Sequence, residues 1–252
     1  MLSLSDLKNR KNGHQKDFRL CLLPDKGAYN EDTDKGRFYV TPEGNRYRSV
    51  TGFLSTLKGE PEWLDRWVQK LGGEEKAEIE MTRRKNRGTG VHLSLEHLIA
   101  NDPQPQHAGE YLQMYYQLET MLRLYCDDIY ASELALYSHV LQLGGRVDCI
   151  AKWKGELSII DFKTSSNFKK PDWITDYFLQ STCYSLMLEE MYGLKAKQIV
   201  IMVCIEGEIK PQIFVRDRSE FLPLLREKVK EFRRIQAEQA KKEESSLLDF
   251  FS

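Results

Sequence analysis

The chain has 252 residues, of which 41% are hydrophobic and 30% are charged, and this composition excludes a disordered tail. No stretch approaches the roughly 18 consecutive apolar residues of a membrane span, so an integral membrane protein is excluded as well. The formal net charge is −1, so overall charge alone does not identify a nucleic-acid-binding protein.

Two further features bear on where the protein works. The N-terminus has no hydrophobic signal core and too few arginines for a transit peptide. The five cysteines are widely scattered, which is typical of free thiols in a reducing compartment. We expect a cytoplasmic protein of a bacterium or of a phage-infected host cell, with no membrane partner.

The first half of the chain predicts mostly helix after a polar start. Residues 1–46 are expected to be an N-terminal extension with one or two short strands. A Pro-Glu-Gly-Asn turn between residues 37–40 and 47–51 predicts a hairpin. Apolar spacing then predicts four helices, with a break at Gly88-Thr-Gly90 between the second and third. These helices are expected at 61–71, 74–86, 91–101 and 111–125.

From residue 129 the apolar period changes to two, which predicts strands. Three consecutive antiparallel strands are expected, followed by a helix, a second β pair and a long charged helix. The expected ranges are 129–137, 141–151 and 156–162 for the strands, 173–192 for the helix, 198–205 and 209–215 for the pair, and 219–242 for the last helix. The sequence thus predicts one α/β domain over residues 47–242, with a tail at 243–252.

The motif with the most chemical content lies on the second and third of these strands. Alternation places Asp161 and Lys163 on one face of a strand, and Asp148 on the preceding strand faces them. Their neighbours are apolar, and buried charges need compensation. A divalent cation, Mg²⁺ or Mn²⁺, would neutralise the two carboxylates. The alternative is an edge-strand ion pair beside a turn aspartate.

Other candidate residues are weaker when each is considered by itself. His92 is placed at a helix start after the glycines, and a single histidine is more often structural than a ligand. Gln180 and Tyr184 are four residues apart and share a helix face. Glu133 on the first strand is by itself an ordinary surface acid.

The ordered set Gly-x-x-x-His92, Glu133, Gly-x-x-Asp148, Asp161-x-Lys-Thr and Gln180-x-x-x-Tyr resembles the RecB-like branch of the PD-(D/E)XK nuclease superfamily. The resemblance covers roughly residues 47–216 and is closest to the mitochondrial genome maintenance exonuclease family and its phage and bacterial relatives. It implies an α/β, restriction-endonuclease-like core sheet flanked by helices, with an N-terminal helical arch.

The resemblance also implies roles for individual residues. Asp148 and Asp161 would ligate the metal, with the carbonyl of Phe162 as a third oxygen ligand. Lys163 would be the catalytic lysine. His92 would be a further ligand and Glu133 would lie beside the metal, although the segment from Glu133 to Asp148 is longer than expected. Gln180 and Tyr184 would line the site. The scattered cysteines predict that no Fe–S cluster is present.

The same resemblance implies a Mg²⁺-dependent exodeoxyribonuclease that threads single-stranded DNA through an arch at residues 60–100, in replication, recombination or repair. A flap or structure-specific endonuclease and a catalytically idle DNA-binding scaffold remain open.

A basic cluster with no acid nearby in the sequence and two later lysines are expected to contact phosphates. Aromatic residues are expected to be either stacking platforms or core. The cations are Arg83, Arg84, Lys85, Arg87, Lys169 and Lys170, and the aromatics are Trp63, Trp67 and Tyr177.

The tail carries apolar residues after a highly charged helix, and such residues reduce solubility unless they are covered. The spacing of Leu247, Phe250 and Phe251 resembles the peptide by which replication and repair enzymes bind a sliding clamp. The alternative is that the tail docks on the domain itself.

Overall fold

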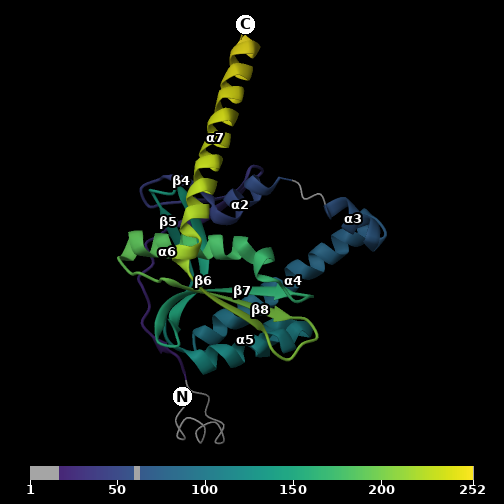
Figure 1. The fold of residues 1–252 in the computed structure, drawn as a ribbon, viewed down its shortest axis with the longest axis vertical. Coiled ribbons are helices and arrows are strands. Elements are labelled where there is room, and N and C mark those ends of the chain that lie inside the picture. The colour runs from purple at the N-terminus through teal and green to yellow at the C-terminus, as the bar shows by residue number, and fades with distance from the viewer. Residues whose placement is uncertain (1–16, 60–62, 252) are drawn as a thin grey trace, which may run out of the picture.

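The computed structural model describes residues 17–59 and 63–251, and the side chains of Trp63 and of residues 243–251 lie outside that description. Within the described residues, the strands form one mixed sheet with helices on both faces (Figure 1). The strands are β1 (Arg19–Leu20), β2 (Tyr29–Thr33), β3 (Gly36–Val40), β4 (Arg46–Ser49), β5 (Cys126–Ser138), β6 (Leu143–Trp153), β7 (Glu156–Ser165), β8 (Gln198–Ile205) and β9 (Gln212–Asp217).

Six longer helices and three short 3₁₀ helices connect these strands in the described residues. The longer helices are α2 (Val50–Lys58), α3 (Trp63–Leu71), α4 (Glu74–Ile99), α5 (Leu112–Tyr125), α6 (Thr175–Tyr192) and α7 (Leu222–Phe251). The 3₁₀ helices are η1 (Pro105–Tyr111), η2 (Pro171–Ile174) and η3 (Arg218–Glu220).

The centre of the sheet is the predicted three-stranded meander. β6 pairs antiparallel with β5 on one side and with β7 on the other, so this prediction is confirmed. β7 then pairs parallel with β8, and β8 pairs antiparallel with β9. The predicted hairpin of β3 and β4 is also confirmed, and β4 joins the meander through a short parallel pairing with β6.

The sheet separates two apolar cores. On one face, Val91 and Leu95 of α4 and Leu118 of α5 pack against Ile160 and neighbouring strand residues. The opposite face is covered by α2, α6 and α7, whose buried residues include Phe53, Leu179 and Phe232. Because side chains alternate along a strand, β7 contributes Ile159 to the second core and Ile160 to the first.

Helix α4 corrects the predicted break at Gly88-Thr-Gly90, because it is continuous from Glu74 to Ile99. Glycine in a helix costs about 1 kcal/mol relative to alanine, so its presence needs another reason. A Cβ on Gly90 would lie 2.5 Å from the carbonyl oxygen of His107 in η1. The glycine therefore permits close packing of η1 on α4 and does not end the helix.

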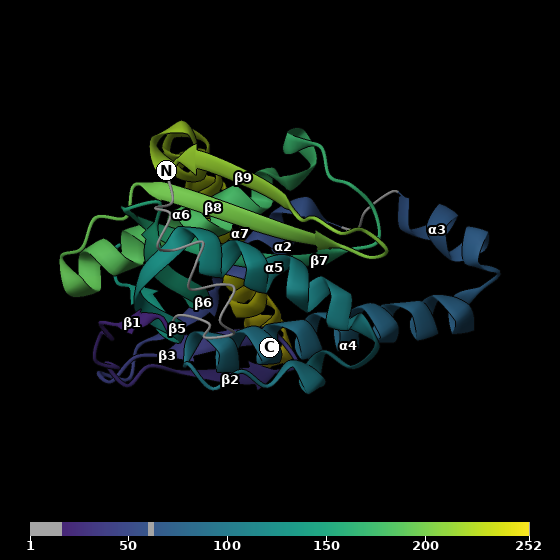
Figure 2. The same cartoon turned by 90° about the horizontal axis from the view of Figure 1, so that it is seen from below.

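Two helical segments extend away from the sheet. Helix α3 and the beginning of α4 form an arm, which Figure 2 shows standing clear of the strands. The C-terminal part of α7 projects in another direction (Figure 1). The last helix was expected to end near residue 242, but α7 continues to Phe251. The expected domain boundaries at residues 47 and 242 fall inside β4 and α7. Strands β1 to β3, which lie in the expected N-terminal extension, belong to the sheet.

Candidate active site

The site forms where β6 and β7 separate. Their pairing runs from Trp153 opposite Glu156 to Cys149 opposite Ile160. Beyond that point the amide of Phe162 donates a hydrogen bond of 2.7 Å to Oδ2 of Asp148 in place of a backbone carbonyl. The side chain of Asp148 is 12% exposed, so its carboxylate lies at the opening and not in the core.

Asp161 and Lys163 form an ion pair on the face of β7 that α6 covers. The lysine Nζ lies 2.6 Å from Oδ2 of Asp161, whose side chain is buried, and 5.1 Å from the centre of the Tyr177 ring. Burial raises the pKa of the Asp161 carboxyl, and the ammonium of Lys163 opposes that shift. Burial alone would lower the pKa of Lys163, but the carboxylates of Asp161 and Asp148 outweigh it and raise the pKa. The lysine is therefore a charged hydrogen-bond donor held at a fixed position.

His92 reaches the same point from the opposite face of the sheet. It was expected at a helix start, but it lies inside α4, whose continuation through the glycines carries it to β7. Its Nε2 is 3.0 Å from the carbonyl oxygen of Phe162, and its Nδ1 is 3.8 Å from Oδ2 of Asp148. The imidazole thus lies between a carboxylate and the carbonyl that the sequence predicted as ligands.

Glu133 lies opposite Asp148 across the β5–β6 pair. The register of Ser132 with Cys149 and of Leu134 with Val147 places it there. Its backbone φ is 51°, in the left-handed region that non-glycine residues rarely adopt in a strand. Burial, followed by the negative charges of Asp148 and Glu96, raises the pKa of Glu133 to about 7.

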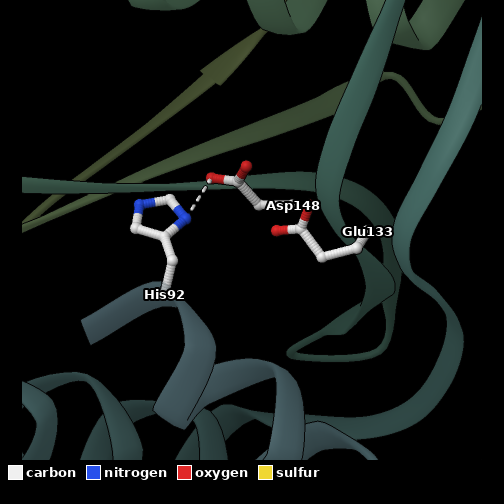
Figure 3. Close-up of side chains that lie close together, drawn as sticks. All are labelled: His92, Glu133 and Asp148. Carbon is white, nitrogen blue, oxygen red and sulfur yellow. Dashed lines mark ion pairs between the residues drawn. The ribbon is translucent and has the colours of Figure 1, made fainter. Parts of the chain in front are cut away.

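The ligand atoms of His92, Glu133 and Asp148 all lie within 4.8 Å of one another, and Figure 3 shows them pointing toward one another from α4, β5 and β6. With Asp161 adjacent, the carboxylates of Glu133, Asp148 and Asp161 are accompanied by two cations, Lys163 and Arg146, so negative charge exceeds positive charge at the site. Carboxylate oxygens and one imidazole are ligands that hard or borderline divalent cations accept. The donor set therefore fits a divalent metal ion.

Gln180 and Tyr184 lie behind this cluster. Both side chains are buried on α6, and Nε2 of Gln180 lies 3.2 Å from the hydroxyl of Tyr184. A Cβ on Gly145 would lie 2.4 Å from the tyrosine ring, so this glycine admits the ring against β6. Burial raises the pKa of Tyr184 well above its usual range, and the charges of Asp148 and Asp161 add to the shift. Tyr184 therefore packs against β6, and Gln180 donates a hydrogen bond to its hydroxyl.

The basic cluster on α4 is not free of acids, contrary to expectation. Arg83 contacts both Glu80 and Glu206, with N–O distances of 2.7 and 2.8 Å. Arg84 pairs with Glu80 at 2.7 Å and remains exposed. Arg87 is 3% exposed and pairs with Glu206 at 2.8 Å. Lys85, together with Lys170 in the segment after β7, is exposed, and Lys169 is half-buried.

Sequence reasoning did not identify Glu206 and gave no role to Glu96. Glu206 accepts hydrogen bonds from Arg87 and from Ser166. These two bonds join α4 to the ends of β7 and β8. Nothing local in the sequence indicates this contact, because 119 residues separate the arginine from the glutamate. Glu96 follows His92 by four residues, a helical spacing that does place it on the same face.

Fold and site together define a class: an α/β protein with clustered carboxylates on adjacent strands and a lysine beside them. A family model described as the PD-(D/E)XK nuclease superfamily matches residues 117–247, about half of the chain. The chain therefore belongs to that superfamily, and its mixed sheet flanked by helices is the restriction-endonuclease-like fold that the sequence predicted. A search of curated proteins found no match.

Membership of this superfamily implies a metal-dependent nuclease, a hydrolase that acts on DNA. Glu133, Asp148, Asp161 and Lys163 lie within the matched region, whereas His92 precedes it. In the part of the chain that the structure describes, no helix combines the length and apolarity needed to span a membrane.

Proposed function

We propose that the protein is a metal-dependent exonuclease of the RecB-like branch, which hydrolyses phosphodiester bonds at the ends of single-stranded DNA in replication, recombination or repair. The observation that carries this proposal is the convergence of His92, Glu133 and Asp148 beside the Asp161–Lys163 pair. Ligands for a cation and a fixed ammonium are the two elements that phosphodiester hydrolysis needs from a protein.

We assign the ligand role to His92, Glu133, Asp148 and Asp161, with the carbonyl of Phe162. A divalent cation bound by these groups would supply Lewis acidity toward the scissile phosphate. Lys163, oriented by Asp161, would donate hydrogen bonds to a phosphate oxygen and stabilise its developing negative charge. Gln180 and Tyr184 would keep β6 and β7 in place beneath the reacting phosphate.

Two features support a single strand as the substrate. The arm of α3 and the beginning of α4 stands clear of the strands (Figure 2), and His92 lies further along the same helix, so the arm could guide one strand past Lys163. Lys85, Lys169 and Lys170 would contact its phosphates along the way. A flap endonuclease of the same superfamily would use the same side chains, so substrate topology must distinguish the two activities.

Purified protein should be incubated with circular and with linear single-stranded DNA, the latter labelled at either end, with Mg²⁺, Mn²⁺ or EDTA. Shortened linear strands, intact circles and no reaction in EDTA support the proposal, and the labels give the direction. Cleaved circles or excised flaps would establish an endonuclease. Binding without any cleavage in Mg²⁺ or Mn²⁺ would indicate a catalytically idle scaffold.

We also propose that the C-terminal residues bind a replication sliding clamp. The argument rests on the sequence spacing, because the side chains of Leu247, Phe250 and Phe251 lie outside the described residues. The projection of α7 from the sheet would hold these residues away from the DNA site (Figure 1). Deletion of residues 245–252 should remove clamp binding while the melting temperature and the activity on short oligonucleotides are retained. A lower melting temperature would favour docking on the domain itself.

A further inference from the structure

A short segment, residues 166–173, connects the catalytic strand β7 to helix α6 and carries two exposed aromatic side chains. Phe168 is 55% exposed and Trp173 is 66% exposed. Large aromatic rings that remain this exposed lose the free energy of burial, so such a pair on one short segment indicates an interaction surface.

The backbone of this segment is held in place although its rings are exposed. Lys169 donates its amide to Oε1 of Gln212 on β9 at 2.6 Å and accepts a hydrogen bond of 3.0 Å from Nε2 of the same side chain. The amide of Trp173 donates to the carbonyl of Lys170 at 3.0 Å, and Ile174 is buried directly after it. The two rings are therefore presented by an ordered backbone.

Both ends of the segment are close in sequence to residues of the proposed active site. It begins three residues after Lys163 and ends four residues before Tyr177. The Nζ of Lys163 lies 5.1 Å from the centre of the Tyr177 ring, so the residues that flank the segment on its two sides are in contact. A strand whose phosphate reaches Lys163 would therefore pass close to this segment.

The segment also carries a net positive charge, since Lys169 and Lys170 outnumber Asp172. Nζ of Lys170 lies 5.2 Å from the centre of the Trp173 ring. Arg87 of α4 donates a hydrogen bond of 2.8 Å to the hydroxyl of Ser166 in this segment, and burial, followed by the charges of Arg84 and Arg87, lowers the pKa of Lys169. Among the described residues, neither Lys169 nor Lys170 pairs with a carboxylate. Aromatic rings interleaved with cations are the pattern that holds single-stranded nucleic acid, by base stacking and phosphate contact.

We propose that Phe168 and Trp173 form a stacking platform for unpaired bases of the substrate strand, with Lys169 and Lys170 contacting its phosphates. This inference rests on the proposed function and deepens it, because it names the groups that select a single strand over a duplex. Paired bases are stacked on each other and cannot offer their faces to the two rings.

The test separates binding from cleavage. Binding of fluorescent oligothymidine and of a blunt duplex is measured by anisotropy in EDTA for wild type, Phe168→Ala, Trp173→Ala and the double variant. Loss of one stacked base weakens binding by roughly 5- to 150-fold, so the double variant should lose affinity for the single strand and keep its affinity for the duplex. Trp173→Phe should retain most of the binding. In Mg²⁺ the double variant should raise KM and leave kcat near the wild-type value.

Tyr29→Ala is the matched control, because this ring is 58% exposed on β2 at the other edge of the sheet. It should bind and cleave like the wild type. Wild-type affinity of the double variant, or an equal loss for strand and duplex, would overturn the platform. If the wild type binds through the two rings but cleaves nothing in Mg²⁺ or Mn²⁺, the proposed function fails and the platform stands.

Discussion

The imidazole Nε2 of His92 lies 3.0 Å from the carbonyl oxygen of Phe162, and this contact brings helix α4 to strand β7 across 70 residues of sequence. Both groups are among the ligands that we propose for a divalent cation, and in this structure they contact each other. The geometry of the site thus depends on how α4 is held against the end of β7. Five predictions concern this site and the charges around it.

Replacing Lys163 with alanine should reduce kcat by about 100- to 1,000-fold, because the donor that stabilises phosphate charge is lost. Affinity for single-stranded DNA in EDTA should change by less than about threefold, since one cation among several phosphate contacts is removed. Asp161→Ala should behave in the same way. Single-turnover cleavage and anisotropy binding measure the two effects, and cleavage at the wild-type rate by either variant would refute the assignment.

Glu133→Gln should stabilise the metal-free protein at alkaline pH. The folded-state pKa of about 7 exceeds the ordinary value of 4.5, so folding favours the protonated form and stability is lost as pH rises from 4.5 through 7. The loss amounts to at most roughly 3 kcal/mol above pH 7, and glutamine avoids it. Melting temperatures in EDTA should therefore agree near pH 4 and diverge by pH 8.

The same variant tests the metal site. Mn²⁺ should raise the melting temperature of the wild type at pH 8 more than that of Glu133→Gln, because a bound cation offsets the ionised carboxylate. Glu78→Gln, at an exposed position of α4, controls for the loss of one negative charge. A Mn²⁺ response that is equal in wild type and Glu133→Gln would remove Glu133 from the ligand set.

Arg84→Ala combined with Lys85→Ala should weaken binding of single-stranded DNA about equally for all sequences. Each phosphate contact on a single strand contributes about 0.7 to the slope of log K against log salt, so the slope should fall by up to about 1.4. Titrations at several salt concentrations measure it. An unchanged slope would mean that these exposed side chains do not contact the strand.

Arg87→Ala should act on the fold and not on the salt slope, because this guanidinium is buried between Glu206, Thr164 and Ser166. We expect a loss of about 1–3 kcal/mol in the free energy of unfolding, measured by urea denaturation. Arg87→Lys should not restore it fully, since an ammonium cannot reproduce the planar set of donors. Arg84→Ala, exposed on the same helix, should change stability by less than about 0.5 kcal/mol.

Most of the secondary structure could be predicted from local pattern. The period of two from residue 129 identified the three strands that became β5, β6 and β7, because alternation reflects which face of a strand is buried. The same alternation placed Asp161 and Lys163 on one face, where they form an ion pair. The opposition of Asp148 to that strand followed from the hairpin order.

Tertiary structure decided what depends on residues far apart in the chain. The glycines of α4 predict a break by propensity, but Gly90 is where the carbonyl of His107 packs closely on a continuous helix, and this helix brings His92 to Phe162. Arg87 has the sequence context of a solvated cation, yet Glu206 compensates its burial. The sequence by itself determined the elements and the type of site, because both depend on short-range periodicity. The shape of the site depends on long-range contacts, which no local pattern encodes.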